Sequence, residues 1–337
     1  MKRVTIKDVA KAAGVSYATV SRAFSGSQEI GKETKKRILK ISEEMGYSPS
    51  AVARSMVRKK TETVGIIVPS IQNPYMSEFT SDLEESLRSM GYGIMVCSSG
   101  YDLKNEHETL QMLISKQVDG VFIMPGSAET YKSLLPLIES VPTVFIGENI
   151  QDFPETYVSI DNYNGARQAT EYLYSLGHRK ILYFGNRKNS LTHERRLAGY
   201  MDVCKKHGIK VDILKSNFQR SSRQVGYMLA KHLFEKPVQC TAIFCASDNL
   251  AIGVMQAADE KGIKIPEDIS LMGFDNIAFS NLPRISLTTI DHSLSSLANA
   301  AIDLMMDKIN NGDVGYEHRI LMPKLVERTS CRIIDEE

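Results

Sequence analysis

Long apolar segments are missing from this sequence, and none approaches the roughly 20 residues needed to span a bilayer. The N-terminal segment from Met1 to Val15 is polar and lacks the apolar run of a secretory signal. Cysteine is also scarce, because only five are scattered through 337 residues, without the spacing of a metal site or redox pair. We therefore expect a cytoplasmic protein with reduced thiols rather than a membrane protein or a secreted domain held by disulfides.

The motifs of common enzyme classes are missing as well. No GxGxxG motif follows the first expected strand and no Walker sequence occurs, which disfavours enzymes that bind dinucleotides or nucleotide triphosphates. There is no GxSxG nucleophile elbow and no histidine paired with a cysteine or serine. We expect no catalytic residue, no metal ion and no cofactor. A hydrolase on a doubly wound sheet is the alternative from the enzyme class.

The charge of the chain is unevenly distributed. The composition, 42% hydrophobic and 24% charged, is ordinary for a soluble globular protein, and the length indicates two or three units. Residues 1–60 contain 14 Lys and Arg against 5 Asp and Glu, giving +9, whereas the remaining chain contains 27 against 35, giving −8. A basic head on an acidic body is typical of nucleic-acid binding. Charge alone would equally fit a solvated basic terminus.

Residues 1–46 have the pattern of a helix-turn-helix domain. Thr5 begins a capping box in which Asp8 takes the place of the usual glutamate. Gly14 suits the left-handed end of this first helix, and Ser16 can cap a second helix soon afterwards. Two helices joined by a short turn that contains glycine are the signature of the motif. The expected buried faces are Ile6, Val9, Ala10 and Ala13 in the first helix, Val20, Ala23 and Phe24 in the second, and Ile38, Ile41 and Met45 in a third that stops at Gly46.

The second helix is expected to read DNA because of the side chains that it leaves exposed, which are Tyr17, Ala18, Ser21 and Arg22. An arginine can hold guanine O6 and N7 through two hydrogen bonds, and a small apolar side chain can pack on a thymine methyl group. Nearby hydroxyls and cations suit phosphate contacts, which set the register without reading sequence. A three-helix protein-interaction module is the alternative, and the charge asymmetry disfavours it. The expected phosphate contacts are Thr5, Ser21, Lys32, Thr34 and Lys35.

These residues resemble a known family. The run TIKDVAKAAGVS at residues 5–16, followed by ATVSR at residues 18–22, looks like the head of the lactose/galactose-repressor family of bacterial transcription regulators. The resemblance resumes with GYSPSAVARS at residues 46–55 and continues to about residue 330, so it covers nearly the whole chain. It implies a helix-turn-helix domain at 1–46, a hinge at 47–60 and an effector-binding, dimerising domain at 61–332. The DNA contacts expected from the head are Thr5, Ser16, Tyr17, Ala18, Ser21 and Arg22.

The hinge has the features of a helix that forms conditionally. Pro49 suits the first position of a helix with Ser48 as its cap, but residues 50–57 are too few to be stably helical alone. In the family this segment folds on operator DNA, pairs across the dimer and wedges an apolar side chain into the minor groove. Met56 takes the wedge position, where many members carry leucine. Ala53 is expected to approach the groove floor and Arg54 to supply positive charge. An inert linker is the alternative.

From Thr63 onward the pattern changes to strands that alternate with helices and end at glycines. Such alternation predicts parallel doubly wound sheets, with ligands bound beyond the carboxyl ends of the strands. The resemblance implies two lobes like those of periplasmic sugar-binding proteins, an N-lobe of about 61–160 and 291–322 and a C-lobe of about 161–290 and 323–332. The expected strands are 64–68, 93–97, 118–124, 143–146, 180–184, 242–245 and 270–273, and the expected helices are 75–90, 166–176, 194–206 and 249–261.

The loops at the strand ends carry an aromatic surface together with isolated Asp, Asn, Arg and hydroxyl side chains, which suit polyhydroxylated small molecules. The resemblance implies that Arg196 and Asp275 contact the effector. Asp248 lies in the matching Ser-Asp-Asn loop, with a role that could be structural. Ser190 stands where the purine-responsive member carries a specificity arginine, which argues against a purine effector. Lining side chains are expected from Tyr75, Met76 and Phe218.

Each of these assignments has a structural alternative. Arg196 could form a surface ion pair, for instance with Glu194, and Asp275 could cap a turn. Tyr75 and Phe218 could belong to the core. Two further polar residues are expected to be structural rather than functional: Asp161 as a helix cap and His178 as a hydrogen-bonded histidine.

The function that these patterns predict is a repressor that binds a pseudo-palindromic operator as a homodimer, with its affinity controlled by a sugar or sugar derivative in the cleft between the lobes. The matching dimer surfaces are the helix at 75–90 and the region 218–282. Whether the effector strengthens or weakens DNA binding depends on which state it prefers. One alternative is a global regulator gated by a phosphorylated carrier protein. A transport-type binding protein fails because the head is present and the signal peptide is not.

Overall fold

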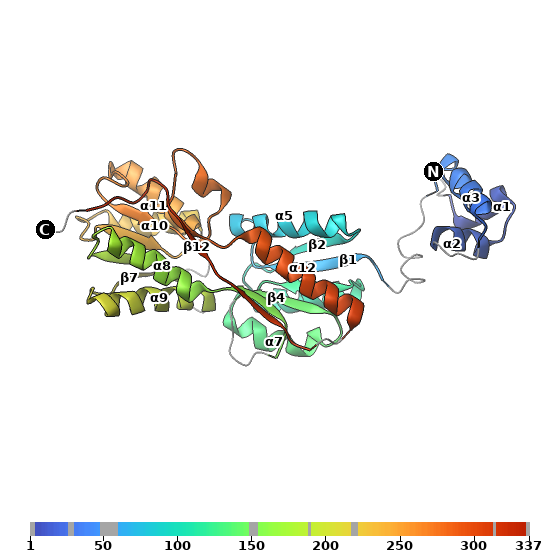
Figure 1. Cartoon of the computed structure of the whole chain (residues 1–337), viewed down its shortest axis with the longest axis horizontal. Helices are drawn as coiled ribbons and strands as arrows, with labels where there is room; N and C mark the ends of the chain where they lie inside the picture. Colours follow the sequence, from blue (N-terminus) through green and yellow to red (C-terminus); the bar gives the residue numbers. More distant parts are fainter. Residues whose placement is uncertain are drawn as a thin grey trace. The chain divides into compact units, whose positions relative to one another are not determined.

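The computed structural model describes residues 4–25, 30–47, 60–147, 154–187, 190–216, 222–312 and 315–334. It divides the chain into two units (Figure 1). The smaller unit contains residues 1–63 together with 117–119, and the larger one contains residues 64–116 and 120–337.

The smaller unit contains the three expected head helices: α1 (Ile6–Ala13), α2 (Tyr17–Ser25) and α3 (Lys32–Glu44). The Asp8 carboxylate accepts hydrogen bonds from the Thr5 backbone N–H at 2.8 Å and from the Thr5 hydroxyl at 2.7 Å. Gly14, at φ +60°, ends α1, and Ser16 Oγ accepts a bond from Thr19 N at 3.1 Å to begin α2. The predicted helix-turn-helix fold is confirmed. Its small core is built around the fully buried Val9, Val20 and Ile38.

The larger unit has two parallel sheets, the first of which has six strands in the order β11-β5-β4-β3-β1-β2. We call this sheet with its helices the sheet A lobe. Its neighbouring strands pair in parallel, for example β1 with β3 and β4 with β5. Helices α5 (Pro74–Ser89) and α12 (Leu294–Asn311) cover one face, and α6 (Leu103–Ser115) and α7 (Ala128–Ile138) cover the other (Figure 1). The strands are β1 (Thr63–Val68), β2 (Gly93–Ser98), β3 (Gly120–Ile123), β4 (Thr143–Gly147), β5 (Tyr157–Ile160) and β11 (His318–Leu321).

The second sheet and its helices form the sheet B lobe, with strand order β7-β6-β8-β9 and parallel pairing throughout. Helices α8 (Asn162–Ser175) and α9 (Leu191–His207) pack together on one face, and α10 (Arg223–Leu233) and α11 (Asp248–Lys261) pack together on the other. Large aromatic side chains fill its core, where each fully buried ring contributes about 2–3 kcal/mol of transfer free energy. The strands are β6 (Ile181–Arg187), β7 (Asp212–Ser216), β8 (Ala242–Cys245) and β9 (Ser270–Met272).

The chain passes between the lobes in three crossovers, at residues 160–162, 291–294 and 321–324. Strands β10 (Thr289–Asp291) and β12 (Lys324–Val326) form a two-stranded antiparallel ribbon beside two of them. At the first crossover, Asp161 caps α8 by accepting a bond from Asn164 N at 2.9 Å, as predicted. The crossovers therefore place residues from both lobes around one shared space.

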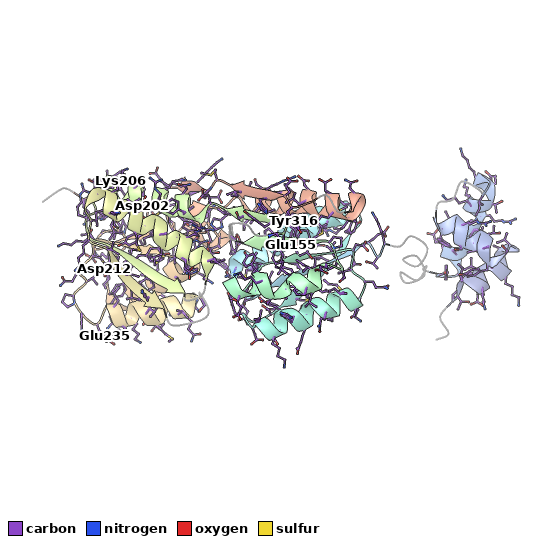
Figure 2. All side chains as sticks on the ribbon, turned by 90° about the horizontal axis from the view of Figure 1, so that it is seen from below. Glu155, Asp202, Lys206, Asp212, Glu235 and Tyr316 are labelled. Carbon is purple, nitrogen blue, oxygen red and sulfur yellow. The ribbon has the colours of Figure 1, made fainter. Side chains whose placement is uncertain are left out.

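His178 is a polar side chain outside this space that has structural partners. His178 is fully buried, and its ring nitrogens lie 2.9 Å from Thr241 Oγ1 and 3.0 Å from Ser270 Oγ. Burial lowers the pKa of His178 to about 4, so the ring is neutral at pH 7, and the predicted structural role is confirmed. Figure 2 shows side chains such as Asp202 and Lys206 on the outer face of α9.

Candidate functional site

The exposed side of α2 presents the side chains that the sequence predicted to read DNA. Tyr17 is 54% exposed, Ala18 and Arg22 are also exposed, and Ser21 is half-buried. On the opposite side of the helix, Val20 is buried in the head core and fixes the orientation of α2. The structure therefore brings the four predicted side chains together on one surface.

Two further predicted contacts, Thr5 and Ser16, build the starts of the helices. The Thr5 hydroxyl donates to the Asp8 carboxylate, and Ser16 Oγ lies 2.8 Å from Thr19 Oγ1 while it caps α2. These bonds hold the N-termini of α1 and α2, where exposed backbone N–H groups favour negatively charged partners. A direct contact of either hydroxyl with DNA stays a prediction.

Several predicted residues lie outside the part of the chain that the structure describes. They are the hinge residues Ala53, Arg54 and Met56, the surrounding segment 50–57, and the aromatic residue Phe218. Their roles stay predictions.

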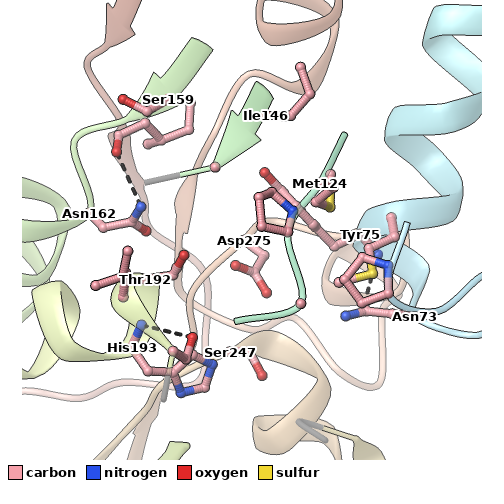
Figure 3. A pocket seen from close by; sticks show the side chains of 18 of the residues that line it. Asn73, Tyr75, Met124, Ile146, Ser159, Asn162, Thr192, His193, Ser247 and Asp275 are labelled. Atoms are coloured by element: carbon pink, nitrogen blue, oxygen red, sulfur yellow. Dashed lines mark hydrogen bonds between the residues drawn. The ribbon is translucent and has the colours of Figure 1, made fainter. Parts of the chain in front are cut away.

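In the larger unit, a cavity of about 120 Å³ lies between the strand ends of the two lobes (Figure 3). Asp275 projects into the middle of this cleft, with Asn162 and Thr192 on one side and Tyr75 and Met124 on the other. This is the position at which open parallel sheets bind their ligands. The cavity is also lined by Met76, Ile146, Val158, Ser159, Ser190, Arg196, Ser247 and His292.

Arg196 of α9 is only 4% exposed, and its guanidinium group is held by several partners. Nε donates to Asn162 Oδ1 at 2.8 Å, and Nη1 donates to the Ala246 carbonyl at 2.6 Å. Nη2 lies 3.0 Å from Asp275 Oδ1, and the guanidinium carbon lies 3.8 Å from the centre of the Phe274 ring. A buried charge requires such partners. The alternative of a surface ion pair is therefore wrong.

Asp275 is held in an unusual backbone conformation. Its φ is +124°, a region that non-glycine residues rarely adopt, and its N–H donates to the Ile290 carbonyl at 2.9 Å. The side chain is buried against Arg196, with an exposed fraction of 7%. Burial raises the pKa of Asp275 to about 7, although the positive charge of Arg196 pulls this pKa down. The carboxylate is therefore a buried acceptor that faces the cleft.

His292 lies in the second crossover and is 2% exposed. Its Nε2 lies 3.5 Å from Arg196 Nη2, and because a guanidinium can only donate, Nε2 must be the acceptor. Burial, reinforced by Arg196, holds the pKa of His292 well below its usual value, so the ring is neutral and its proton is on Nδ1. The ring makes an edge contact with Tyr75, with centroids 5.1 Å apart.

Asp248 does not line the cleft, although its neighbour Ser247 does. The Asp248 carboxylate is fully buried and accepts bonds from Ile277 N at 3.1 Å and from the hydroxyls of Ser280 and Thr289, each at 2.5 Å. Burial raises the pKa of Asp248, and these donors oppose that shift. The structural role left open by the sequence is the one that these contacts support.

The remaining predicted cleft residues occupy different walls. Tyr75 and Met76 lie at the start of α5, where Asn73 Oδ1 accepts a bond from Tyr75 N at 3.2 Å. Ser190 caps α9 by accepting a bond from His193 N at 3.4 Å and is 3% exposed. The structure therefore brings Tyr75, Met76 and Ser190 into the same cavity as Arg196 and Asp275.

Ser159, Asn162 and His292 are among the cleft residues that were not predicted from the sequence. Ser159 lies on β5, Asn162 begins α8, and His292 follows β10, so only the crossovers bring them together. In the segment Ser159-Ile160-Asp161-Asn162, the sequence predicted a role only for Asp161, as a helix cap. No local pattern marks a crossover, because its geometry depends on both sheets.

A second link between the lobes lies outside the cleft. The Glu78 carboxylate of α5 accepts hydrogen bonds from Ala278 N, at 3.0 Å to Oε1 and 3.2 Å to Oε2. Ala278 begins the short 3₁₀ helix η1 (Ala278–Asn281) that follows β9. Burial is the main cause that raises the pKa of Glu78.

The described residues contain neither a metal-binding cluster nor a membrane-spanning helix. Within those ranges, no three His, Cys, Asp or Glu side chains are grouped so that they could hold a metal ion. In the same part of the chain, no helix combines the length and apolar character needed to cross a membrane.

Comparison with known proteins places this geometry in a family. A family model for bacterial regulatory proteins of the lacI family matches residues 5–50, and one for a periplasmic binding protein-like domain matches residues 170–331. The repressor PurR of Pasteurella multocida is 32% identical over 332 residues, covering 97% of this chain and 98% of its own. The ribose operon repressor of Haemophilus influenzae is 32% identical over 330 residues, with the same coverage of both chains.

Solved structures agree with the fold. The lac repressor dimer bound to operator and the anti-inducer ONPF has a TM-score of 0.88 at 24% identity, covering 98% of this chain and 100% of its own. A LacI-type regulator from Alkaliphilus metalliredigens, complexed with D-xylulofuranose, has a TM-score of 0.71 at 30% identity, covering 80% of this chain and 99% of its own. The chain belongs to the LacI family of bacterial regulatory proteins. It is a transcription regulator.

Proposed function

We propose that the chain is a cytoplasmic, homodimeric repressor without catalytic activity, whose affinity for operator DNA is set by a sugar-like effector in the cleft. The observation that carries this proposal is the buried Arg196–Asp275 pair, which lines the cavity between the lobes. It belongs to a chain whose head presents Tyr17, Ala18 and Arg22 to solvent. We propose lobe boundaries near residues 160, 291 and 322, at the crossovers.

The DNA-reading role rests on chemistry as well as on the family. The exposed strip of α2 offers one arginine, one aromatic ring and one methyl group, a set that suits the base edges of the major groove. The basic balance of residues 1–60 supplies the sequence-independent attraction to phosphates. Reading a pseudo-palindrome requires two copies of this head.

Dimerisation is supported by exposed apolar side chains near α5 and η1. Strand β2 lies at the end of the sheet A strand order, and its Met95 and Val96 are 38% and 44% exposed. Ile71 before α5, Phe279 in η1 and Leu282 after it are exposed by 47–57%. Exposed apolar side chains of this size are typical of protein interfaces. We propose this face as the contact between two copies.

A sugar is favoured over a purine by one cleft residue, because identity does not decide the effector. Relatives named PurR are 32–34% identical to this chain, and the ribose operon repressor is 32% identical. Ser190 stands where the resemblance places an arginine in the purine-responsive member, and its hydroxyl caps α9. An effector that binds one arrangement of the lobes better than the other would shift the head and hinge between DNA-binding and free states.

The test of the DNA-reading role compares Arg22→Ala with Lys32→Ala on duplexes selected from a random-sequence pool. We expect Arg22→Ala to relax base preference at one or two positions of each half-site, with a loss of about 1–3 kcal/mol on the preferred base. Lys32→Ala, the control, should weaken binding to all sequences alike and reduce its salt dependence. Equal weakening of all sequences by Arg22→Ala would make Arg22 a phosphate contact. Wild-type binding that did not change with salt would contradict the DNA-binding proposal.

A further inference from the structure

Strand β11 forms one end of sheet A, and no strand among the described residues pairs with its outer edge. On its inner edge, which pairs in parallel with β5, the carbonyl oxygens of Glu317 and Leu321 accept backbone N–H bonds at 3.1 Å and 3.0 Å. Because the backbone groups of successive residues in a strand point to opposite edges, those of His318 and Ile320 point to the outer edge. They form a row of donors and acceptors with which another strand can pair.

One face of this strand carries exposed aromatic and apolar side chains at alternate positions. Tyr316, labelled in Figure 2, is 62% exposed, Ile320 is 44% exposed and Met322 is 60% exposed. His318 lies between the first two, is also exposed, and stacks on Tyr157 of β5 with ring centroids 4.1 Å apart. Since alternate positions of a strand share one face, Tyr316, His318, Ile320 and Met322 form a continuous surface, which we call the β11 stripe.

The other face of β11 points toward α12 and carries charges of both signs. Arg319 Nη1 lies 3.4 Å from Asp303 Oδ2 of α12, and Arg319 Nε donates to Glu317 Oε1 at 2.8 Å. Glu317 and Arg319 are the two neighbours of His318 in the sequence, and Tyr316 and Ile320 lie one position further out. The segment 316–320 therefore has opposite charges, and beyond them an aromatic and an apolar side chain, at equal distances from His318.

This arrangement makes the strand complementary to a second copy of itself. In an antiparallel pair with a two-fold axis through His318, Glu317 of one copy faces Arg319 of the other, and Tyr316 faces Ile320. Opposite charges and aromatic with β-branched side chains are favourable cross-strand pairs. His318 becomes a hydrogen-bonded pair, which uses the backbone groups at the outer edge. An axis through Arg319 would instead place two arginines opposite each other, so the charges select the register.

The other sheet ends differ from this one. The opposite end of sheet A is β2, whose exposed Met95 and Val96 belong to the proposed dimer face. Strand β7, at one end of sheet B, carries Asp212 and Lys215 at exposed positions, and charges of this kind protect an edge from pairing. Strand β11 contains neither lysine nor proline, and its stripe is uncharged apart from any proton on His318.

We propose that two copies of this chain pair through their β11 strands, in a contact separate from the dimer face near α5 and η1, so that one dimer joins a second dimer. A dimer that uses the β2 end of each sheet A leaves both of its β11 strands outside that contact, and pairing them is self-complementary. The assembly contains two pairs of heads, enough for two operator duplexes. The proposal goes beyond the proposed function, which requires only one dimer.

Sedimentation velocity of the full-length chain at concentrations from about 1 to 100 μM tests the contact, because a contact as small as a short strand pair is weak. We expect Ile320→Lys to weaken association beyond the dimer about tenfold or more by placing a charge in the β11 stripe. Met201→Lys is the matched control, because Met201 on α9 is 43% exposed, much like Ile320 at 44%, and lies in the other lobe. The control should associate as wild type does. The proposal is overturned if Ile320→Lys also associates as wild type does, or if both variants lose association equally.

Exchanging charges tests the register of the pair. Glu317→Arg places two arginines opposite each other and Arg319→Glu places two glutamates opposite each other, so each variant alone should associate roughly tenfold more weakly. Mixing the two proteins should restore association, since every arginine then faces a glutamate of the other copy. A mixture that associates no better than its components would overturn pairing about His318. Because Arg319 also contacts Asp303, melting temperatures are measured first; if Arg319→Glu does not fold, Glu317→Arg and Ile320→Lys decide the proposal.

Phe279→Lys separates this contact from the proposed dimer face. It should weaken the dimer itself but leave pairing through β11, which Ile320→Lys in the same chain should then remove. If Phe279→Lys leaves all association intact while Ile320→Lys abolishes it, the dimer face of the proposed function is wrong and the β11 contact stands. If Phe279→Lys forms no pairs that depend on Ile320 at the highest concentration, the β11 contact is wrong and the dimer face stands.

Discussion

The two lobes contribute different chemistry to one cleft. The sheet A lobe supplies mainly apolar and aromatic surface, from Tyr75, Met76, Met124, Ile146 and Val158. The sheet B lobe supplies the ion pair of Arg196 and Asp275, together with polar side chains such as Ser247. One wall therefore excludes water and shapes the ligand, while the other orients it through charged hydrogen bonds.

Behind each wall lies a buried carboxylate that the ligand does not reach. In the sheet A lobe, Glu106 accepts bonds from Gly126 N at 2.9 Å and from Thr130 Oγ1 at 2.5 Å, which hold the loop after β3. In the sheet B lobe, Asp248 holds the segment after β9 in the same way. The three buried acids thus differ in what they face: Asp275 and its partner Arg196 line the cavity, whereas Asp248 and Glu106 do not.

The largest effect is expected from the polar wall. Asp275→Ala should weaken binding of the sugar effector by about 100-fold or more, because it removes charge-assisted bonds to hydroxyls and leaves Arg196 buried without its counter-charge. Operator binding should remain, while its response to sugar is lost, as titration and DNA-binding assays on one preparation would measure.

Asp248→Asn is the matched control for Asp275→Ala. It changes a buried carboxylate of the same lobe that bonds Ser280 and Thr289 rather than the cavity. We expect a lower free energy of unfolding, by about 1–3 kcal/mol, with little change in sugar affinity of the folded protein. If Asp275→Ala leaves the sugar response intact, the proposal that Asp275 binds the effector while Asp248 has a structural role is wrong.

A smaller effect is expected from the apolar wall. Tyr75→Ala should weaken sugar binding about tenfold by removing a ring that covers the ligand and contacts His292 edge to face. It should weaken different uncharged sugars by similar factors, since a ring face makes few directional bonds. Tyr75→Phe retains the ring and should bind nearly as wild type does. Competition titrations with two sugars measure both effects, and a change in sugar preference would assign a directional contact to Tyr75.

The smallest effect concerns pH. Burial raises the pKa of Asp275 to about 7, and only its ionised form accepts a charge-assisted hydrogen bond from a sugar hydroxyl. Binding should therefore be nearly constant above pH 8 and fall as the pH drops through 7, approaching a tenfold loss per unit below it. Arg196 and His292 face the same carboxylate, with Asp248 and Glu78 nearby; His292, whose pKa is far lower, stays neutral in this range.

The control for the pH dependence is the Asp275→Ala protein, whose residual sugar binding should not change between pH 6 and pH 8. Calorimetric titration at several pH values measures both profiles. A flat profile in the wild type would mean that the Asp275 carboxylate does not accept a bond from the sugar.

The elements of this molecule could be predicted from its sequence where nearby residues determine the start and end of a helix or strand. The capping box of Thr5 and Asp8, the glycine at Gly14 and the serine cap at Ser16 determine where the head helices begin and end. The apolar runs of the parallel strands and the glycine stops likewise indicated two doubly wound sheets. The helices α6, α7, α10 and α12 were not predicted, although the buried Leu297, Ala298, Ala301 and Ile302 of α12 recur with helical spacing and could have indicated it.

The candidate site could be predicted only in part. The resemblance supplied Arg196 and Asp275, but sequence could not show that they pair, because 79 positions separate them and only the sheet B topology joins them. Asp248 and Asp275 occupy similar loops after neighbouring strands, and only the direction of each side chain separates a structural acid from a cleft acid. Ser159 and His292 could not be predicted from the sequence. Only the structure shows that Ser159 Oγ and His292 Nδ1 are buried without a hydrogen-bond partner among the described residues.

The hydrogen bonds from Ala278 N to Glu78 have a consequence for the state without ligand. They join α5 to η1 across the lobes, at a distance in the fold from the ion pair of the cleft. Any rotation of one lobe against the other must lengthen or break them. We therefore expect a substitution of Glu78, which does not line the cavity, to change the balance between the arrangements of the lobes in the absence of an effector.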